Sequence, residues 1–129
     1  MATNQDIQVT KVLVVEDDSL NKELELEIVE SMGFCADGAE GGKKAVEMAQ
    51  KETYDLIIMD IEFPDIDGIE AARLIRNIPG YKNTPMIAVT AFAMKGDRQR
   101  FLASGFNDYV EKPIDVKEFI KVLGKYKKE

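Results

Sequence analysis

The sequence contains no histidine, no tryptophan and a single cysteine among its 129 residues. Without histidine, a Ser-His-Asp triad, a Cys-His dyad and the commonest protein ligand of transition metals are all excluded. Any metal site must be built from oxygen atoms, which favours a hard cation such as Mg²⁺, Mn²⁺ or Ca²⁺. Because Cys35 has no partner cysteine in the chain, the fold must rest on a hydrophobic core.

Long hydrophobic runs are absent as well. No stretch approaches the ~20 apolar residues that a membrane-spanning helix needs. The first ten residues are polar and lack the basic and apolar regions of a signal peptide. We therefore expect a cytoplasmic protein that does not contact a membrane. The length and the 45% apolar composition predict one domain over residues 1–129, with a core over about 9–125 and a polar tail over 1–8.

Acidic residues outnumber basic ones, with 24 Asp+Glu against 17 Lys+Arg, and the formal net charge is −7. The excess lies in residues 1–90, which hold 8 basic and 18 acidic side chains, whereas residues 91–129 hold 9 and 6. Direct DNA binding is not expected for such an acidic chain. The basic residues near the C-terminus mark either a partner surface or a solvated helix face. They are Lys95, Arg98, Arg100, Lys121, Lys125, Lys127 and Lys128.

Short apolar runs alternate with helical patterns along the chain. The runs predict strands over 11–15, 34–36, 56–59, 86–90 and 108–111. The helical patterns cover 20–32, 39–51, 67–77, 95–104 and 116–123. This (βα)₅ alternation predicts an α/β fold with a doubly wound, five-stranded parallel sheet and helices on both of its faces.

Finer features can also be predicted within these elements. Leu20, Leu24 and Ile28 recur at i, i+4 and i+8, which predicts the buried face of the first helix. Cys35 lies in a short apolar run, which favours a buried, unreactive side chain. Aspartates precede three of the helices and predict N-caps at positions 18, 67 and 115.

Polar side chains follow four of the predicted strands. Glu16 and Asp17 follow the first, Asp60 the third, Thr90 ends the fourth and Lys112 follows the fifth. Because the carboxyl ends of parallel strands meet at one edge of the sheet, these groups should lie together. Crowded carboxylates repel one another, and a divalent cation relieves the repulsion. A cation, a lysine, a hydroxyl and a free carboxylate are the parts that phosphoryl transfer needs, and Asp60 is the natural nucleophile.

Four segments resemble the receiver domain of response regulators, the CheY-like family. They are VLVVEDD (12–18), LIIMDIEFPDIDGIE (56–70), IAVTAFA (87–93) and YVEKPI (109–114). The segment VTAFAMKGD (89–97) is particularly similar to stand-alone receivers of the cell-cycle regulator type. The resemblance covers about residues 9–125 and implies a flavodoxin-like sheet with strand order 2-1-3-4-5.

The resemblance also implies roles for the acidic residues and the lysine. Asp60 matches the phospho-acceptor. Glu16 and Asp17 match the acidic pair that, with Asp60, holds Mg²⁺ or Mn²⁺, and many members have Asp where this chain has Glu16. Glu62 matches the residue whose main-chain carbonyl is a further metal ligand. Lys112 matches the lysine that pairs with the phosphoryl oxygens.

Further roles follow for residues around these groups. Thr90 matches the hydroxyl residue that binds the phosphoryl group, and Ala91 the small residue whose backbone N–H points into the site. Tyr109 matches the aromatic switch position, which turns inward when the threonine shifts. Pro113 matches a proline whose preceding peptide bond is cis. Phe92 occupies a variable position, and we hypothesise that it screens the acyl phosphate from water.

The function implied is that of a receiver in a two-component phosphorelay. A sensor histidine kinase or a histidine phosphotransfer protein would donate the phosphoryl group to Asp60. The domain would then signal to a protein target through its fourth helix, fifth strand and fifth helix, as a monomer or a phosphorylation-dependent dimer. It would not be a conventional enzyme, although it would catalyse its own phosphorylation and dephosphorylation.

Three other interpretations compete with this one. The chain would be an inactive pseudo-receiver if it accepted no phosphoryl group. The spacing of Asp60 and Glu62 faintly matches hydrolases with an aspartate nucleophile and a second acid two residues later. A flavodoxin-like binding role is disfavoured because the acids at 16–18 would repel a phosphate in the absence of a metal.

Overall fold

The computed structural model describes residues 10–61, 67–91 and 97–127. Its strands are β1 (Lys11–Val15), β2 (Cys35–Ala39), β3 (Leu56–Asp60), β4 (Met86–Thr90) and β5 (Asp108–Glu111). Its helices are α1 (Ser19–Ser31), α2 (Gly42–Lys51), α3 (Gly68–Arg76), α4 (Asp97–Ala103) and α5 (Val116–Gly124). Strands and helices alternate throughout, which confirms the predicted (βα)₅ order.

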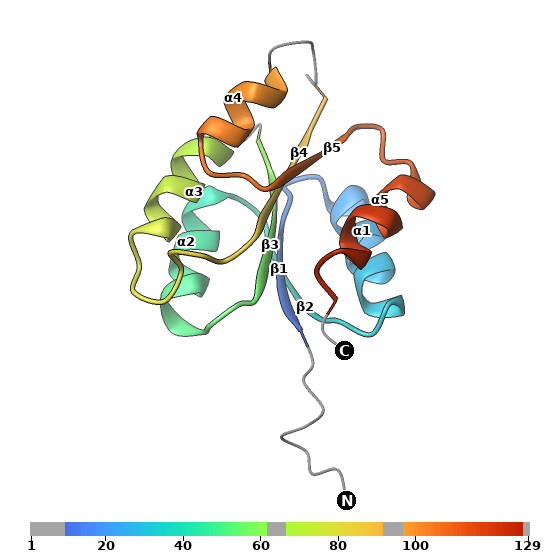
Figure 1. The fold of residues 1–129 in the computed structure, drawn as a ribbon. Coiled ribbons are helices and arrows are strands. Elements are labelled where there is room, and N and C mark those ends of the chain that lie inside the picture. The colour runs from blue at the N-terminus through green and yellow to red at the C-terminus, as the bar shows by residue number, and fades with distance from the viewer. Residues whose placement is uncertain (1–9, 62–66, 92–96, 128–129) are drawn as a thin grey trace, which may run out of the picture.

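The strands form one parallel sheet in the order β2-β1-β3-β4-β5, as predicted. Helices α1 and α5 cover one face of the sheet, and α2, α3 and α4 cover the other (Figure 1). β2 lies on one side of β1, and β3, β4 and β5 follow on its other side. The direction in which strands are added to the sheet therefore reverses at β1. A ligand site is expected at the carboxyl ends of strands next to such a reversal.

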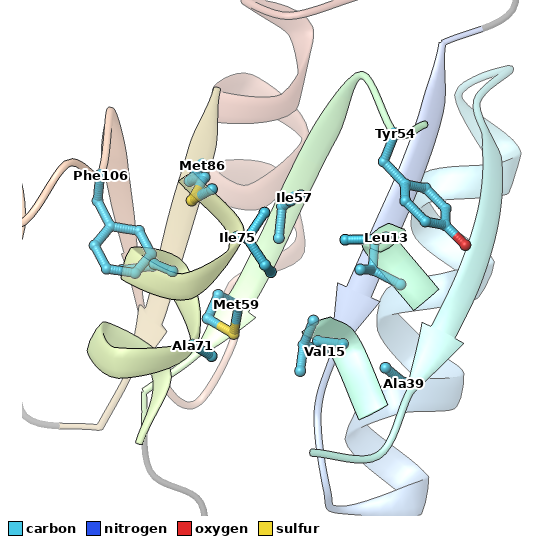
Figure 2. Close-up of a cluster of buried hydrophobic side chains, with 14 of the residues drawn as sticks. Leu13, Val15, Ala39, Tyr54, Ile57, Met59, Ala71, Ile75, Met86 and Phe106 are labelled. Atoms are coloured by element: carbon cyan, nitrogen blue, oxygen red, sulfur yellow. The ribbon is translucent and has the colours of Figure 1, made fainter. Parts of the chain in front are cut away.

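The core is divided by the sheet into two layers. Successive side chains of a strand point to opposite faces. Leu13 and Met59 therefore pack in the layer beneath α2 and α3 (Figure 2), whereas Val14 and Ile58 pack against α1 and α5. All residues of β3 and β4 are buried, which explains why these strands are uniformly apolar in sequence until their last residue.

The predicted N-caps are confirmed by hydrogen bonds. Asp18 Oδ1 accepts from the backbone N–H groups of Leu20 and Asn21 at 3.0 and 3.1 Å. The Asp67 and Asp115 side chains accept from the N–H groups three residues later, at 2.8 and 3.2 Å. These bonds satisfy donors that the first turn of a helix leaves without partners.

The predicted buried face of α1 is wrong at two of its three residues, Leu20 and Leu24. Leu20 is 77% exposed and Leu24 is 37% exposed, and the buried residues are Glu25, Ile28 and Val29. Four residues advance a helix by ~40° more than one turn, so a series at i, i+4 and i+8 drifts around the axis. The stripe that faces the sheet follows the i, i+3, i+4 spacing instead.

The second strand also differs from its prediction. It runs over Cys35–Ala39, so Ala39 belongs to the strand and α2 begins only at Gly42. Cys35 is exposed, not buried as the short apolar run suggested. β2 lies at the edge of the sheet, and only its last residue, Ala39, is buried.

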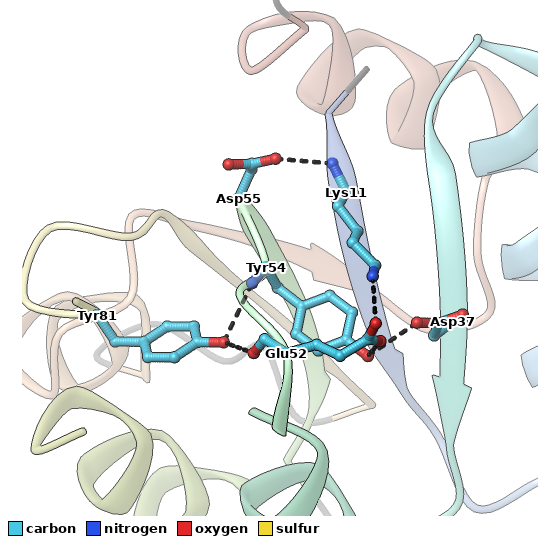
Figure 3. Close-up of polar contacts among 6 residues, drawn as sticks. All are labelled: Lys11, Asp37, Glu52, Tyr54, Asp55 and Tyr81. Carbon is cyan, nitrogen blue, oxygen red and sulfur yellow. Dashed lines mark hydrogen bonds and ion pairs between the residues drawn. The ribbon is translucent and has the colours of Figure 1, made fainter. Parts of the chain in front are cut away.

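A network of polar side chains closes the amino end of the sheet (Figure 3). The Tyr81 hydroxyl donates to the Glu52 carbonyl oxygen at 2.6 Å and accepts from Tyr54 N–H at 3.1 Å. The Tyr54 hydroxyl donates to Asp37 at 2.8 Å, and Lys11 Nζ donates to Glu52 Oε1 at 2.8 Å. Both tyrosines are buried. Their hydrogen bonds and that of Lys11 join β1, β2 and the residues directly before β3.

No helix in the described ranges has both the length and the apolar character required to cross a membrane. The cytoplasmic location stays a prediction.

Candidate functional site

The residues predicted to form a site are brought together at the carboxyl edge of the sheet. Asp60 and Thr90 are the last residues of the neighbouring strands β3 and β4. Glu16 directly follows β1, and Lys112 directly follows β5. Because β1, β3, β4 and β5 are consecutive in the sheet, side chains separated by up to 96 positions in sequence meet here.

Lys112 links the two buried acids of the site. Its Nζ atom lies 2.8 Å from Asp60 Oδ2 and 3.0 Å from Glu16 Oε1. The same atom donates to Glu16 Oε2 at 3.3 Å. Glu16 and Asp60 are fully buried or nearly so, whereas Asp17 beside them is exposed. Glu16 and Asp60 are therefore buried and paired with Lys112, whereas the Asp17 side chain is open to solvent.

Local backbone contacts fix these side chains. Glu16 N–H donates to the Ala39 carbonyl at 2.9 Å, and Asp18 N–H donates to Glu16 Oε2 at 3.2 Å. Lys112 N–H donates to the Thr90 carbonyl at 2.8 Å, which ties the lysine to the end of β4. Asp18 itself serves as the cap of α1, as predicted.

Gly68 determines how closely α3 approaches the site. Its N–H donates to the Ile61 carbonyl at 2.8 Å. A Cβ atom at this position would lie 2.3 Å from the Asp60 carbonyl oxygen and 2.8 Å from Ile61 Cα. Both are backbone atoms, so no side-chain rotation relieves the overlap. Only glycine lets the start of α3 lie against the residue that carries the Asp60 carboxylate.

The electrostatics of the site are set by burial and by crowding of acids. Burial raises the pKa of Glu16, and the neighbouring Asp60 raises it further. Burial lowers the pKa of Lys112, but its hydrogen bonds with Asp60 and Glu16 outweigh that effect and raise the pKa above its ordinary value. Lys112 is therefore a fixed cation at neutral pH.

The donor set fits a hard divalent cation. Glu16, Asp17 and Asp60 each offer a carboxylate oxygen, and these oxygens lie within 4.8 Å of one another. One lysine contacts two of the three acids in the described part of the chain, so negative charge remains in excess. Carboxylate oxygens at this spacing are the ligands that Mg²⁺ and Mn²⁺ prefer.

The remaining predicted residues surround this cluster. Thr90 is buried at the end of β4, and Ala91 follows it at the surface. Tyr109 is half-buried on β5, with its ring centroid 6.4 Å from that of Phe101 on α4. The peptide bond before Pro113 is cis, as predicted. Glu62 and Phe92, and with them the proposed carbonyl ligand and water screen, lie outside the described residues.

Sequence reasoning missed two residues of the site, Gly68 and Glu25. Glu25 on α1 is fully buried, and burial, followed by the effect of the neighbouring Glu16, raises its pKa to about 9. The signal for Glu25 was present, since it lies three and four residues before the buried Ile28 and Val29. Gly68 carried no such signal, because the chain gives no indication of which glycine a strand will approach.

Comparison with known proteins agrees with this fold. The sequence matches the family model of the response regulator receiver domain over residues 12–124. The match covers most of the chain, and the protein belongs to the response regulator receiver domain family. It is therefore a two-component signalling domain and not a conventional enzyme.

Two curated relatives illustrate where such domains occur. The polar-differentiation response regulator DivK of Brucella anthropi is 37% identical over 115 residues, which cover 89% of this chain and 94% of DivK. The signal transduction histidine-protein kinase BarA of Shigella flexneri is 40% identical over 116 residues, or 90% of this chain. This chain spans only 13% of the length of BarA.

Solved structures share the architecture. The chemotaxis protein CheY4 of Vibrio cholerae has a TM-score of 0.86 at 27% identity, with 92% of this chain and 99% of CheY4 covered. The receiver domain of the Pseudomonas aeruginosa sensor histidine kinase PA1611 has a TM-score of 0.82 at 34% identity, with 92% and 98% covered. That structure has a magnesium ion coordinated in its active-site cleft.

Proposed function

We propose that this receiver domain accepts a phosphoryl group on Asp60 and signals by a change of conformation. The observation that carries the proposal is the buried Asp60 carboxylate held 2.8 Å from Lys112 inside a cluster of acids. Relatives that are histidine kinases support phosphohistidine as the donor, on a kinase or on a histidine phosphotransfer protein. The pseudo-receiver and hydrolase interpretations have no observation in their favour.

Glu16, Asp17 and Asp60 would hold Mg²⁺ or Mn²⁺. When bound, the cation supplies positive charge that neutralises oxygens of the phosphoryl group. Of the described residues, Asp17 is the exposed member of the cluster and marks the side from which solvent and ligands reach it. The excess of negative charge in the absence of a cation makes its binding favourable.

Asp60, Lys112 and Thr90 would each have a separate role in the phosphoryl transfer. A carboxylate oxygen of Asp60 attacks the phosphorus atom, and an O–P bond forms as the P–N bond of the phosphohistidine breaks. The imidazole nitrogen leaves with the bonding electron pair. Lys112 neutralises charge on the transferred group, and Thr90 would supply a hydroxyl donor to it.

A groove connects this site to a surface suited to a protein target. It has a volume of about 580 Å³ and runs along α4, β5 and α5. Lys112 and Pro113 line it at the site, and Tyr109 and the 45% exposed Leu102 line it farther away. Movement of Lys112 or Tyr109 on phosphorylation would alter the shape of this groove. We propose it as the target surface, with Lys125, directly after α5, among its lining residues.

The decisive experiment is phosphorylation by a small acyl phosphate in the presence of Mg²⁺, followed by measurement of intact mass. We expect one phosphate adduct in the wild-type protein and none in Asp60→Asn. Asp18→Asn is the matched control, because asparagine caps a helix as well as aspartate does and the adduct should persist. The absence of any adduct would favour the pseudo-receiver, and continuous turnover of the donor without an adduct would favour the hydrolase.

A further inference from the structure

Asp18 lies between the first helix and the acids of the site. On the helix side, its Oδ1 atom accepts hydrogen bonds from the N–H groups of Leu20 and Asn21 at 3.0 and 3.1 Å. Its carbonyl oxygen accepts from Lys22 N–H at 2.9 Å. These bonds hold residue 18 in the extended conformation that is typical of an N-cap, with φ −77° and ψ 118°. The backbone of Asp18 is therefore fixed by α1.

The backbone N–H of Asp18 acts on the side of the site. It donates a hydrogen bond to Glu16 Oε2 at 3.2 Å, and Lys112 Nζ donates to the same oxygen at 3.3 Å. Glu16 Oε1 lies 3.0 Å from Lys112 Nζ but accepts no hydrogen bond from the described residues. A buried carboxylate is therefore placed by a long, flexible lysine side chain and by a backbone N–H, and of these two donors the backbone N–H is the rigid one.

The helix that carries this N–H is well supported. Ile28 and Val29 of α1 are buried in the core layer that also contains Val14 and Ile58. Asp18 itself is exposed at the start of the helix. A substitution at position 18 can therefore remove the cap without leaving a cavity in the core, so its effect on Glu16 can be separated from an effect on packing.

We propose that Asp18 is a positioning residue for the metal site: its side chain caps α1, and the cap fixes the backbone N–H that holds the Glu16 carboxylate beside Asp17 and Asp60. This inference rests on the proposed function, since Asp18 acts on the cation only through Glu16. Outer-shell hydrogen bonds of this kind fix the orientation of a metal ligand, and their loss weakens metal binding by about 10- to 100-fold.

Two other roles for Asp18 make different predictions. As a direct metal ligand it would use its own carboxylate, but the acids whose oxygens lie within 4.8 Å of one another are Glu16, Asp17 and Asp60. As a helix cap alone it would affect the stability of the fold and leave the affinity for the cation unchanged. Asparagine separates these roles, since its side-chain oxygen caps a helix as well as that of aspartate and carries no charge.

The experiment measures the Mg²⁺ and Mn²⁺ affinity of the whole chain by calorimetry. We expect Asp18→Asn to bind within about threefold of wild type, and Asp18→Ala to bind about tenfold more weakly or worse. Asp115→Ala is the matched control, because it also removes an acid that caps a helix, and its affinity should equal that of wild type. Urea unfolding reports whether each variant folds. Asp18→Gly replaces Asp18→Ala if alanine prevents folding, since glycine is tolerated at an N-cap but offers no side-chain acceptor.

A second measurement does not depend on a metal. In metal-free protein, amide hydrogen exchange followed by NMR reports on the N–H group of residue 18 itself. We expect this N–H to be protected in wild type and in Asp18→Asn, and to exchange about tenfold faster or more in Asp18→Ala. An unprotected N–H in wild type overturns the inference even if the metal binds.

The affinities supply the other contrary outcomes. Wild-type affinity in Asp18→Ala would make Asp18 a helix cap alone. A loss in Asp18→Asn as large as in Asp18→Ala would show that the charge of the carboxylate matters and not the cap, and an equal loss in Asp115→Ala would make the effect nonspecific. If wild type itself bound no cation, the metal site of the proposed function would fail together with this inference, whereas failure of the inference alone leaves the affinity of wild type intact.

Discussion

The two ends of the sheet use the same kinds of side chain but differ in how deeply their acids are buried. At the amino end, Lys11 and Glu52 form one pair, and two tyrosine hydroxyls bridge the remaining polar groups (Figure 3). At the carboxyl end, Glu16, Asp17 and Asp60 form one cluster, in which Lys112 pairs with Glu16 and Asp60. Each set holds one lysine and three acids. In the first set, Lys11 and the Tyr54 hydroxyl donate hydrogen bonds to all three acids, whereas in the second set two of the acids, Glu16 and Asp60, are buried and depend on Lys112.

This difference shows what separates a structural polar cluster from a functional one. Both clusters contain a lysine whose Nζ lies 2.8 Å from a carboxylate oxygen, so the presence of an ion pair distinguishes nothing. The distinguishing feature is burial of acids without enough cations among the described residues. Such a cluster is stable only if a ligand supplies the missing charge or if a proton does so.

Replacement of each lysine in turn should give the largest difference in phosphorylation rate between the two ends of the sheet. Lys112→Met removes the cation beside Asp60, and we expect the rate of phosphorylation by a small acyl phosphate to fall about a hundredfold or more. Lys11→Met removes an equally short ion pair at the other end and should leave that rate within about twofold. Rates come from the time course of the phosphate adduct. Equal losses in the two variants would contradict the division between the ends.

A methyl group at Gly68 tests how tightly the carboxyl end is packed. Gly68→Ala places Cβ against the Asp60 and Ile61 backbone, and we expect it to cost about 2 kcal/mol of unfolding free energy and to slow phosphorylation. Gly124→Ala is the control, because nothing lies within 4 Å of a Cβ there. Urea unfolding measures both. Equal stability of the two variants would show that α3 can move away from Asp60.

Removal of the Tyr81 hydroxyl tests the amino end alone. Tyr81→Phe leaves the Tyr54 N–H and the Glu52 carbonyl without their partner, and we expect a loss of about 1–2 kcal/mol of unfolding free energy. The phosphorylation rate should not change. Tyr109→Phe, on a partly buried tyrosine of β5, should change stability by less than about 0.5 kcal/mol. A change in phosphorylation rate in Tyr81→Phe would mean that the two ends are coupled.

The smallest expected effect concerns the pH dependence of the exposed Lys11–Glu52 pair. The hydrogen bond that Glu52 accepts from Lys11 lowers the pKa of Glu52 in the folded protein. The stabilisation is therefore present above the unfolded pKa of Glu52 and is lost as pH falls through the lowered folded value. Wild type should be slightly more stable than Glu52→Gln at pH 7, and in urea titrations the difference should vanish once the pH lies below the lowered pKa of Glu52. A difference that persists in acid would refute the ionic origin of the contact.

The sequence predicts the frame of the protein well, because alternation of apolar runs and capped helices is a local signal. The site residues at the strand ends also follow from it, since parallel strands place Glu16, Asp60 and Lys112 at one edge. The predictions that failed concern the burial of side chains, which tertiary packing decides. The exposure of Leu20 and Cys35 depends on which side of α1 meets the sheet and which strand lies at the edge.

The two missed residues show the same limit. Glu25 is an ordinary helix residue until the structure places it behind Glu16, and Gly68 is an ordinary turn glycine until the end of β3 lies against it. Neither property is encoded in local spacing. Both arise from the approach of elements that are distant along the chain.

The exposed thiol at the start of β2 has a practical consequence. Cys35 is the one cysteine of the sequence, and it pairs in register with Lys11 at the amino end of the sheet. A thiol-reactive fluorophore or spin label would therefore attach at one defined point, away from the acids, without any engineered substitution. A label on Cys35 could therefore be used to follow the docking of a partner at the opposite edge of the sheet.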